Sequence, residues 1–457
     1  MGVESVNYQC PACGGPLRYD GAKALLVCDH CDSEFALADI EARYAAKQES
    51  AEERAQAVAG NAGGAAQAGA ATEAESLNGA YVCSSCAAEL VCDDTTAVSE
   101  CPYCGNPVVA AGRFSGDFRP DLVIPFKLDR KAAESALAEH YKGKVLLPKS
   151  FAGGNRIKEV QGVYVPFWLM DADAAGSATF EATRTRRHYE GDDEVIETDH
   201  FNVEREGSVS FERIPVDGSS KMPDAHMDAI EPFDYGALVP YSVAYMPGFV
   251  ANRYDEDAET CRGRAEKRID TSVRQALENS IEGYDDVTCD SCEVEKNWAD
   301  PVYALMPVWM LGTIWEGEQF LFAMNGQTGR LVGDLPVDKK KRTFIGVGIF
   351  AALFLICFAA VNFGGFLAEN AAALQWGFML LIPLLVALIV CAVLTGQMKS
   401  AVEATEADRY LDASSINITR QLDTFTHTTT KRIHHEKSEK DQSFDFRFVI
   451  TNASSGS

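Results

Sequence analysis

The sequence predicts a multidomain fold with two small β modules, an α+β middle domain with β-hairpins, and a final pair of long helices. Three observations predict it. Paired cysteines repeat near the N-terminus, strand-like apolar runs fill the middle, and two long uncharged stretches lie near the C-terminus. A chain of 457 residues is also too long for a single hydrophobic core, so several folded units are expected.

The N-terminal part contains the same cysteine pattern twice. Each block has two CxxC pairs separated by fourteen residues, and each cysteine of the second block lies 73 positions after its counterpart in the first. Tyr8 and Tyr81 keep the same offset. The two sets are Cys10, Cys13, Cys28 and Cys31, and Cys83, Cys86, Cys101 and Cys104. This spacing indicates an internal repeat.

The spacing predicts two structural Zn²⁺ sites in two zinc ribbons. A CxxC turn places two thiolates on one side of a tight turn, and a second pair completes a tetrahedron at about 2.3 Å per Zn–S bond. Residues 25–27 and 89–91 supply short strands beside these turns. Because four thiolates leave no open coordination position, catalysis at the metal is disfavoured. His30 could replace a ligand, but a surface imidazole is favoured because four cysteines suffice.

The charge balance disfavours nucleic acid as the partner. The net charge is −26, and residues 1–45 carry seven acidic and three basic side chains. Residues 77–116 carry four acidic side chains and a single basic one, Arg113. Phosphate backbones are bound through clustered Lys and Arg. Protein contact is therefore the favoured use of both ribbons.

The N-terminal part is expected to lie in a reducing cytosol. The first forty residues show no signal peptide, and in that compartment paired CxxC motifs hold metal rather than form disulfides. Residues 46–76 are rich in Ala, Gly, Glu and Gln, which predicts a flexible linker. The first ribbon is thus expected at residues 1–45 and the second at residues 77–116.

Residues 117–338 predict one α+β cytoplasmic domain that contains two helices. Asp129 is expected to cap the first helix, which ends at Gly143. Residues 256–280 place apolar side chains at helical spacing, which predicts a longer amphipathic helix.

The strands of this domain are indicated by apolar runs. Residues 163–170 and 304–311 both carry a Pro-x-Trp sequence, which predicts a duplicated β unit. Proline removes a backbone donor, so each of these strands is expected at an edge or a bulge. Asn325 and Gly326 lie between two apolar runs and predict a hairpin.

The middle domain shows no catalytic constellation. Cys289 and Cys292 form a third CxxC pair without a second pair nearby, so ordinary thiols are favoured over a redox or metal role. His188, His200 and His226 show no ligand spacing. Nucleophile elbow, phosphate loop and paired-carboxylate signatures are absent from the sequence. The sequence predicts a protein that is not an enzyme, and a redox role for the Cys289/Cys292 pair stays open.

Residues 344–398 predict a transmembrane helical hairpin. Residues 344–368 and 371–398 carry no charge, and about 20 apolar residues span a bilayer. Lys and Arg flank the pair at residues 339–342 and 399 but are missing from the connection. Both termini are therefore expected to face the cytoplasm, with the two spans crossing the cell membrane as an anchor.

Residues 399–457 predict a cytoplasmic tail. Residues 401–412 are expected to be helical. The part that contains His427, His434 and His435 is expected to be exposed, with plain solvation favoured over metal binding.

The layout resembles bacterial membrane proteins described as TFIIB-type zinc-ribbon-containing proteins. The resemblance rests on the Tyr8-x-Cys10-Pro-x-Cys13-Gly14-Gly15 motif, on Cys101-Pro-Tyr-Cys104-Gly105 and on the final apolar pair. Shorter matches lie at residues 124–126, 163–168, 231–235 and 245–249. Some members of that family are encoded beside phage-shock-type coat proteins and flotillin-like band proteins. The resemblance therefore implies an adaptor that recruits such partners in envelope stress.

The expected function is a non-enzymatic, zinc-stabilised adaptor or scaffold that is anchored in the membrane and recruits protein partners to its inner face. The alternative is a membrane-tethered nucleic-acid-binding or transcription-related zinc-ribbon protein. The acidity of both ribbons favours the first reading.

Overall fold

The structure is a computed structural model that describes residues 3–4, 9–44, 80–82, 89–91, 95–100, 107–109, 114, 118–154, 159–191, 193–363 and 372–434. It divides into two compact units. The first comprises Met1–Asp171, Arg213–Arg268 and Ala299–Arg409, and the second comprises Ala172–Glu212, Ile269–Trp298 and Tyr410–Ser457. This division differs from the single domain predicted over residues 117–338. Boundaries between the units fall within the long strands β10 (Glu159–Glu190) and β11 (Asp193–Asp217). A boundary inside a strand leaves no change of amino-acid composition by which the sequence could have indicated it.

The first cysteine block folds as a small three-stranded antiparallel sheet. It consists of β2 (Leu17–Asp20), β3 (Leu25–Cys28) and β4 (Glu34–Phe35), followed by a helix over residues 37–44. Leu17 and Leu26 are almost fully buried in it. The strand expected at residues 25–27 is therefore confirmed.

The sequence repeat is also a repeat of strands. β6 (Glu89–Val91), β7 (Thr96–Glu100) and β8 (Pro107–Val109) overlap the positions found 73 residues after β2, β3 and β4. The pairing register repeats as well. Val27↔Glu34 in the first block corresponds to Glu100↔Pro107 in the second. The partner of the first strand differs: β2 pairs with β3, whereas β6 pairs with β5 (Ala80–Val82), which pairs with β1 (Val3–Glu4). The 73-residue repeat thus extends from cysteine spacing to the register of one strand pair, β3–β4 and β7–β8.

The main sheet of the first unit is built around two long antiparallel neighbours. These are β15 (Val302–Trp315) and the part of β10 (Glu159–Glu190) that ends at Asp171. The strand order is β12-β9-β15-β10-β13-β7-β8, with β16 also paired to β15 and β17 to β16. The flanking strands are β9 (Leu122–Val123), β12 (Val239–Pro240), β13 (Val250–Asn252), β16 (Glu318–Asn325) and β17 (Leu331–Gly333). β16 and β17 form the predicted hairpin, with Ala323 opposite Val332.

The two proline-containing strands lie inside the sheet, so the prediction of an edge or a bulge is wrong. In each case the proline carbonyl accepts a hydrogen bond from outside the β10–β15 pair, at Pro307 from the Gly326 N–H (2.8 Å) and at Pro166 from the Gly218 N–H (3.0 Å). A strand residue directs its N and C=O to the same side. The ring nitrogens therefore face places where no ladder bond is lost. Beside Pro307, the pairing with β9 ends at Leu305 and the pairing with β16 begins at Val308. Beside Pro166, the pairing with β13 ends at Tyr164.

The core of the first unit covers both faces of β10 and β15. Residues 162–170 and 303–309 are buried without interruption, as expected for strands enclosed on both sides. One face packs against α4 (Asp224–Ala229) and the residues after it, including Ile230 and Phe233. The other face contacts a cluster of aromatic rings: Phe126, Tyr164, Phe249 and Trp309.

The predicted helices of the middle region are confirmed. α2 spans Arg130–His140, and the Asp129 carboxylate accepts the Ala132 N–H at 2.8 Å. Gly143 follows with φ +73°, the left-handed conformation that glycine adopts most readily. α5 spans Ala258–Glu278. Shorter elements are α3 (Lys149–Gly154) and the 3₁₀ turns η2 (Tyr235–Ala237), η3 (Val243–Tyr245), η4 (Asp408–Tyr410) and η5 (Ala413–Ser415).

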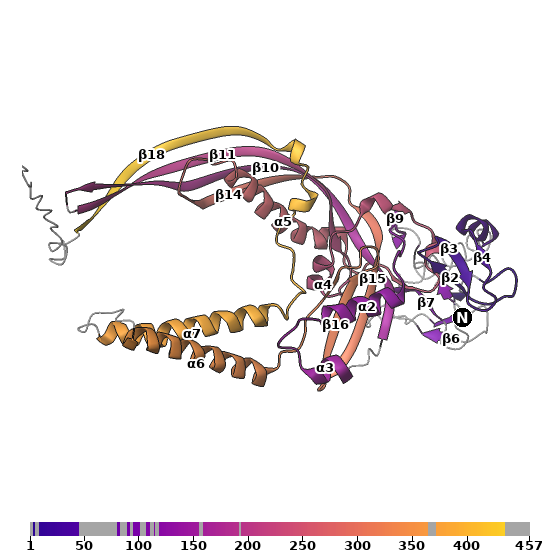
Figure 1. The fold of residues 1–457 in the computed structure, drawn as a ribbon. Helices are drawn as coiled ribbons and strands as arrows, with labels where there is room; N and C mark the ends of the chain where they lie inside the picture. The colour runs from indigo at the N-terminus through magenta and orange to yellow at the C-terminus, as the bar shows by residue number, and fades with distance from the viewer. Residues whose placement is uncertain are drawn as a thin grey trace, which may run out of the picture. The chain divides into compact units, whose positions relative to one another are not determined.

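The second unit is a four-stranded sheet of long strands in the order β14-β10-β11-β18 (Figure 1). Here β10 continues from Ala172, beside β11 (Asp193–Asp217), β14 (Asp286–Trp298) and β18 (Asn417–His434). The end of α5 covers one face. A Cβ on Gly176 would lie 2.5 Å from Val273 and 3.2 Å from Leu277, so glycine allows this close approach.

β18 corrects the prediction of a tail over residues 399–457. Its residues are exposed, as expected, but they form an 18-residue strand antiparallel to β11. The helix predicted over residues 401–412 is wrong, since only η4 is helical there.

Two long helices follow the first unit's last strand. α6 spans Lys339–Phe363 and α7 spans Ala372–Gly396, and they lie side by side (Figure 1). Both contain segments long and apolar enough to cross a membrane, Lys339–Ala360 and Met379–Gly396. Large apolar side chains such as Phe344, Leu355 and Leu381 are 64–81% exposed on them.

Candidate metal centre

The first cysteine block forms two turns of the same geometry. Within the first turn, the Cys10 N–H donates to the Gly15 carbonyl (2.8 Å) and the Gly14 N–H donates to the Cys10 carbonyl (2.9 Å). The second turn repeats both bonds between Cys28, Ser33 and Asp32, each at 3.0 Å.

Both turns require positive φ at the residue after their second cysteine. Gly14 has φ +75° and Asp32 has φ +54°. Glycine reaches this region freely, and Asp tolerates it better than most residues. The local sequence therefore holds each CxxC pair in a preformed turn.

The four sulfur atoms of this block converge. Cys10 Sγ lies 3.6 Å from Cys31 Sγ, and Cys13 Sγ lies 3.5 Å from Cys28 Sγ. All four sulfur atoms lie within 4.8 Å of one another. A tetrahedron with Zn–S bonds of about 2.3 Å has edges of about 3.8 Å, whereas a disulfide brings two sulfurs to about 2.05 Å. The spacing matches a metal tetrahedron, and all four cysteines are free thiols.

Backbone N–H groups point at two of the sulfur atoms, and the pKa values of two of the thiols shift in opposite directions. The Gly15 N–H points to Cys13 Sγ and the His30 N–H to Cys28 Sγ, both at 3.4 Å. Hydrogen bonds with the Ser33 side chain and backbone lower the pKa of Cys31 to about 6. For Cys13 the Gly15 N–H lowers the pKa, but hydrogen bonds with neighbouring thiols and burial outweigh it and raise the pKa to about 12.

The donor set fits a closed, structural site. Four thiolates in tetrahedral spacing suit Zn²⁺, which would hold both turns together without an open position for a substrate. His30 is exposed and contributes its backbone N–H to the site. Among the residues that the structure describes, no other group of His, Cys, Asp and Glu has this geometry.

The four cysteines of the second predicted site are not among the residues that the structure describes. These are Cys83, Cys86, Cys101 and Cys104, and the linker predicted over residues 46–76 also lies outside the described residues. The matching register of β7 and β8 is the structural observation that bears on this block. The second set of ligands therefore stays a prediction.

The first cysteine block packs against the connection between β12 and β13, two strands of the main sheet. The Tyr19 N–H donates to the Pro247 carbonyl (3.0 Å), and the Tyr19 ring meets the Tyr245 ring edge to face at 5.3 Å. The Ser242 hydroxyl donates to Glu41 from the helix of the block. Tyr19 is only 3% exposed, and burial raises its pKa to about 12. The first cysteine block is therefore part of the first unit.

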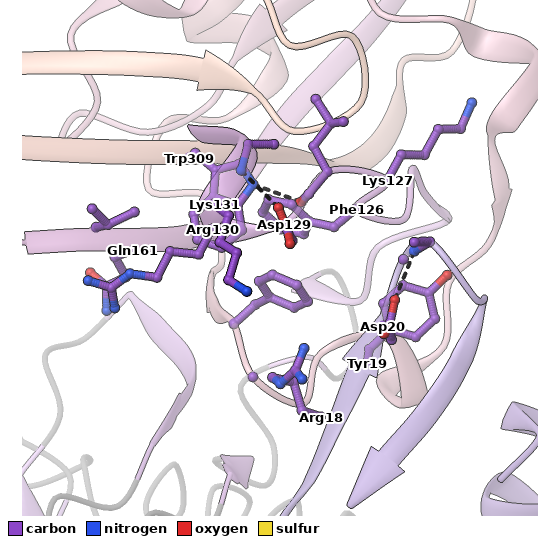
Figure 2. Close-up of a pocket in the computed structure, with 18 of the residues that line it drawn as sticks. Arg18, Tyr19, Asp20, Phe126, Lys127, Asp129, Arg130, Lys131, Gln161 and Trp309 are labelled. Atoms are coloured by element: carbon purple, nitrogen blue, oxygen red, sulfur yellow. Dashed lines mark hydrogen bonds between the residues drawn. The ribbon is translucent and has the colours of Figure 1, made fainter. Parts of the chain in front are cut away.

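A cavity of about 1170 Å³ lies beside this contact (Figure 2). Figure 2 shows Arg18 on one side of the cavity and the first residues of α2 on the other. Most of the cations in its wall are paired with carboxylates: Arg18 with Asp29 (3.3 Å), Lys127 with Asp234 (3.8 Å) and Arg130 with Glu134 (3.0 Å). Two further carboxylates, Asp20 and Asp129, accept backbone N–H groups. The wall thus offers little uncompensated charge.

The third CxxC pair lies on β14 in the second unit. Cys289 and Cys292 are half-buried and free, and burial is the largest cause that raises the pKa of both thiols. A raised thiol pKa disfavours the reactive thiolate. His188, His200 and His226 do not converge. The His226 Nε2–H donates to the Leu321 carbonyl at 3.0 Å, and His200 stacks on His427 with ring centroids 4.4 Å apart.

A buried charge network in the first unit is the feature that the sequence analysis missed. Arg268 makes two hydrogen bonds to Glu231, at 2.8 and 3.1 Å, and both side chains are 4% exposed or less. Arg264 contacts Asp217 (2.8 Å) and Asp228 (3.0 Å). Burial raises the pKa of Asp217 to about 7 against the opposing effect of Arg264. In a chain of −26, these carboxylates could not be distinguished from surface charges.

The described residues define a β-rich protein with a four-cysteine cluster that could hold a metal ion and with two helices apolar enough to cross a membrane. No family model matches the chain. No solved structure matches it. The chain is 34% identical over 252 residues to the uncharacterized protein YdjG of Bacillus subtilis (strain 168), and the match covers 54% of the chain and 74% of YdjG. The chain belongs to the same family as YdjG.

Proposed function

We propose that this protein is a zinc-stabilised adaptor, anchored in the membrane by α6 and α7, that recruits protein partners to the inner membrane face. The observation that carries the proposal is the packing of the first cysteine block against the connection between β12 and β13 of the main sheet. Zn²⁺ at Cys10, Cys13, Cys28 and Cys31 would hold a rigid module against a β-rich body. Such a closed metal site stabilises a surface rather than a reaction.

The helix pair supports the anchoring step. Its outward side chains are apolar along α6 and α7, and a soluble protein rarely exposes such a continuous patch. In a bilayer the same side chains lie in hydrocarbon. The basic residues 339–342 and Lys399 favour a cytoplasmic side for both ends of the pair, because positive residues are retained there.

The charge distribution supports protein over nucleic acid as the partner. The first block carries more acidic than basic residues, and its Arg18 and Lys23 are paired with Asp29 and Glu34. The family resemblance makes phage-shock-type coat proteins and flotillin-like band proteins the partners to test first. A gel shift at low salt separates the alternative, because salt-sensitive DNA or RNA binding would contradict the adaptor reading.

The metal is tested by elemental analysis of the purified full chain. Two zinc ions per chain are expected, falling to one in Cys10→Ser plus Cys13→Ser. The matched control is Cys289→Ser plus Cys292→Ser, which removes a CxxC pair without four-cysteine geometry and should retain both ions. Equal zinc content in all three proteins would contradict the proposed site.

The adaptor role is tested by affinity purification from solubilised membranes with the same variants. A partner that is retained by the control but lost with Cys10→Ser plus Cys13→Ser would assign recruitment to the zinc module. Sodium carbonate extraction of membranes should leave the intact chain in the pellet. Recovery in the supernatant would refute the anchor.

A further inference from the structure

A groove lies between α6 and α7 at the end where α6 begins and α7 finishes. It has a volume of about 800 Å³. Its apolar wall includes Val347 and Phe350 from α6 and Leu384 and Leu388 from α7. The helices approach closely beside it, since a Cβ on Gly346 would lie 3.1 Å from Cys391 Sγ on the other helix.

The polar end of the groove carries a free cation. The hydroxyls of Thr343 and Thr395 donate to carbonyls of their own helices, at 2.9 and 2.7 Å. Arg342 is the charged residue in the groove wall. Within the described part of the chain, no ion pair engages the side chains of Lys339, Lys340 or Arg342. Elsewhere in this unit Arg264 and Arg268 are fully engaged with carboxylates.

Further cations gather at this end of the helices. Lys144 donates to the Gln397 carbonyl at 2.6 Å, and Lys399 is exposed just after α7. The two acidic residues nearby, Asp334 and Asp338, accept backbone N–H groups of Ser400 and Lys341. The base of the helix pair is therefore a positive site in a chain whose net charge is −26.

We propose that this groove binds one acyl chain of an anionic phospholipid, whose phosphate is held by Arg342 and the adjacent lysines. The inference rests on the proposed anchoring of α6 and α7 in a membrane. The occupant follows from charge complementarity. A guanidinium matches phosphate geometry with two hydrogen bonds, and basic sites between membrane helices on the cytoplasmic side suit anionic head groups. A zwitterionic lipid brings its own cation and leaves the lysines uncompensated.

The full chain in detergent, titrated with phosphatidylglycerol or phosphatidylcholine of identical acyl chains and followed by native mass spectrometry, tests this site. One phosphatidylglycerol should bind per chain, and phosphatidylcholine should bind more weakly. Arg342→Gln should weaken phosphatidylglycerol binding about fivefold, because one basic residue near an anionic surface contributes about that factor. Ala392→Phe should abolish it by filling the groove that Ala392 lines.

Two matched controls separate the groove from its surroundings. Lys131→Gln removes an exposed lysine in the first turn of α2, and Leu381→Phe enlarges a side chain that is 65% exposed on α7 outside the groove. Both should bind like the unchanged chain. Equal binding of the two lipids, or unchanged binding in Arg342→Gln, would overturn the proposal. A dimer cross-linked through Cys391 would overturn it in favour of a second copy as the occupant.

The same samples separate this inference from the proposed anchor. If carbonate extraction releases the chain from membranes, the anchor itself fails. If the chain stays in the membrane pellet but shows no preference for phosphatidylglycerol, the anchor stands and the lipid site is refuted.

Discussion

Replacing Glu231 with Gln tests whether the buried Arg268–Glu231 pair holds the first unit together. The carboxylate accepts two hydrogen bonds from the Arg268 guanidinium, and the side chains are 4% and 3% exposed. Glu231→Gln keeps the shape of the side chain but leaves a buried guanidinium without its counter-charge. Losing one partner of such a pair destabilises a protein by about 3–5 kcal/mol.

The matched control is the Arg130–Glu134 pair on α2. It has a similar distance of 3.0 Å, but its side chains are 62% and 44% exposed, so water screens the interaction. Glu134→Gln should change the free energy of unfolding by about 0.5 kcal/mol or less. The comparison isolates burial from charge neutralisation, because both variants convert one Glu to Gln.

Urea unfolding of the full chain in detergent, followed by pulse proteolysis, measures the difference. With a urea dependence of about 3 kcal/mol per M, a loss of about 4 kcal/mol lowers the midpoint by about 1.3 M. Glu134→Gln should shift it by less than about 0.2 M. Similar shifts in the two variants would refute the reasoning. A double replacement by Met at Arg268 and Glu231 should recover much of the loss, since apolar packing can substitute for a buried pair.

Three further outcomes are expected. Because burial raises the folded-state pKa of Asp217 to about 7, its ionisation should destabilise the fold as pH rises from about 4 to 7; Asp217→Asn should remove that part of the pH dependence in thermal melts. Asn325 is fully buried, and its amide donates to the Ile230 and Pro232 carbonyls; Asn325→Leu should cost about 2–4 kcal/mol in urea unfolding. Chelation of the metal should expose Tyr19 to faster nitration, while Tyr189, already 70% exposed, should react equally with and without metal.

The fold of the first cysteine block could be predicted because the residues that determine it lie close together in the sequence. Two CxxC turns, a glycine at positive φ and short apolar strands all lie within about thirty residues, and each favours the same geometry. The 73-residue offset found in the sequence reappears in the structure, because β7 and β8 pair in the register of β3 and β4. The capped helix after Asp129 and the hairpin at Asn325 were likewise predictable from a few neighbouring residues.

The long-range features could not be predicted from the same kind of signal. Pro166 and Pro307 predicted edge strands, but the side that a proline nitrogen faces depends on the pairing of strands distant in the sequence. β18 carries Thr, His and charged residues that bury little surface, so its sequence reads as an exposed tail. Its strand conformation comes from the ladder with β11, which composition does not reveal.

Hydrogen bonds join the base of the helix pair and the segment after α7 to the core of the first unit, so the buried charges also hold that segment in place. The Leu335 N–H donates to the Met398 carbonyl (2.8 Å), which joins the segment before α6 to the end of α7. Further along, the Ala404 N–H donates to Asp228 (3.0 Å) and Arg268 donates to the Glu406 carbonyl (3.2 Å).

The chain that leaves α7 is therefore held by the same residues that form the buried network. The hydrogen bonds that hold this segment join its backbone to the charged side chains of Asp228 and Arg268. Weakening the buried charge network should therefore release the segment after α7 before the sheet unfolds. Glu231→Gln should then increase protease cleavage near Glu406 in native buffer while the zinc content stays unchanged. Loss of zinc in the same variant would instead mean that the metal module and the helix base unfold as one cooperative unit.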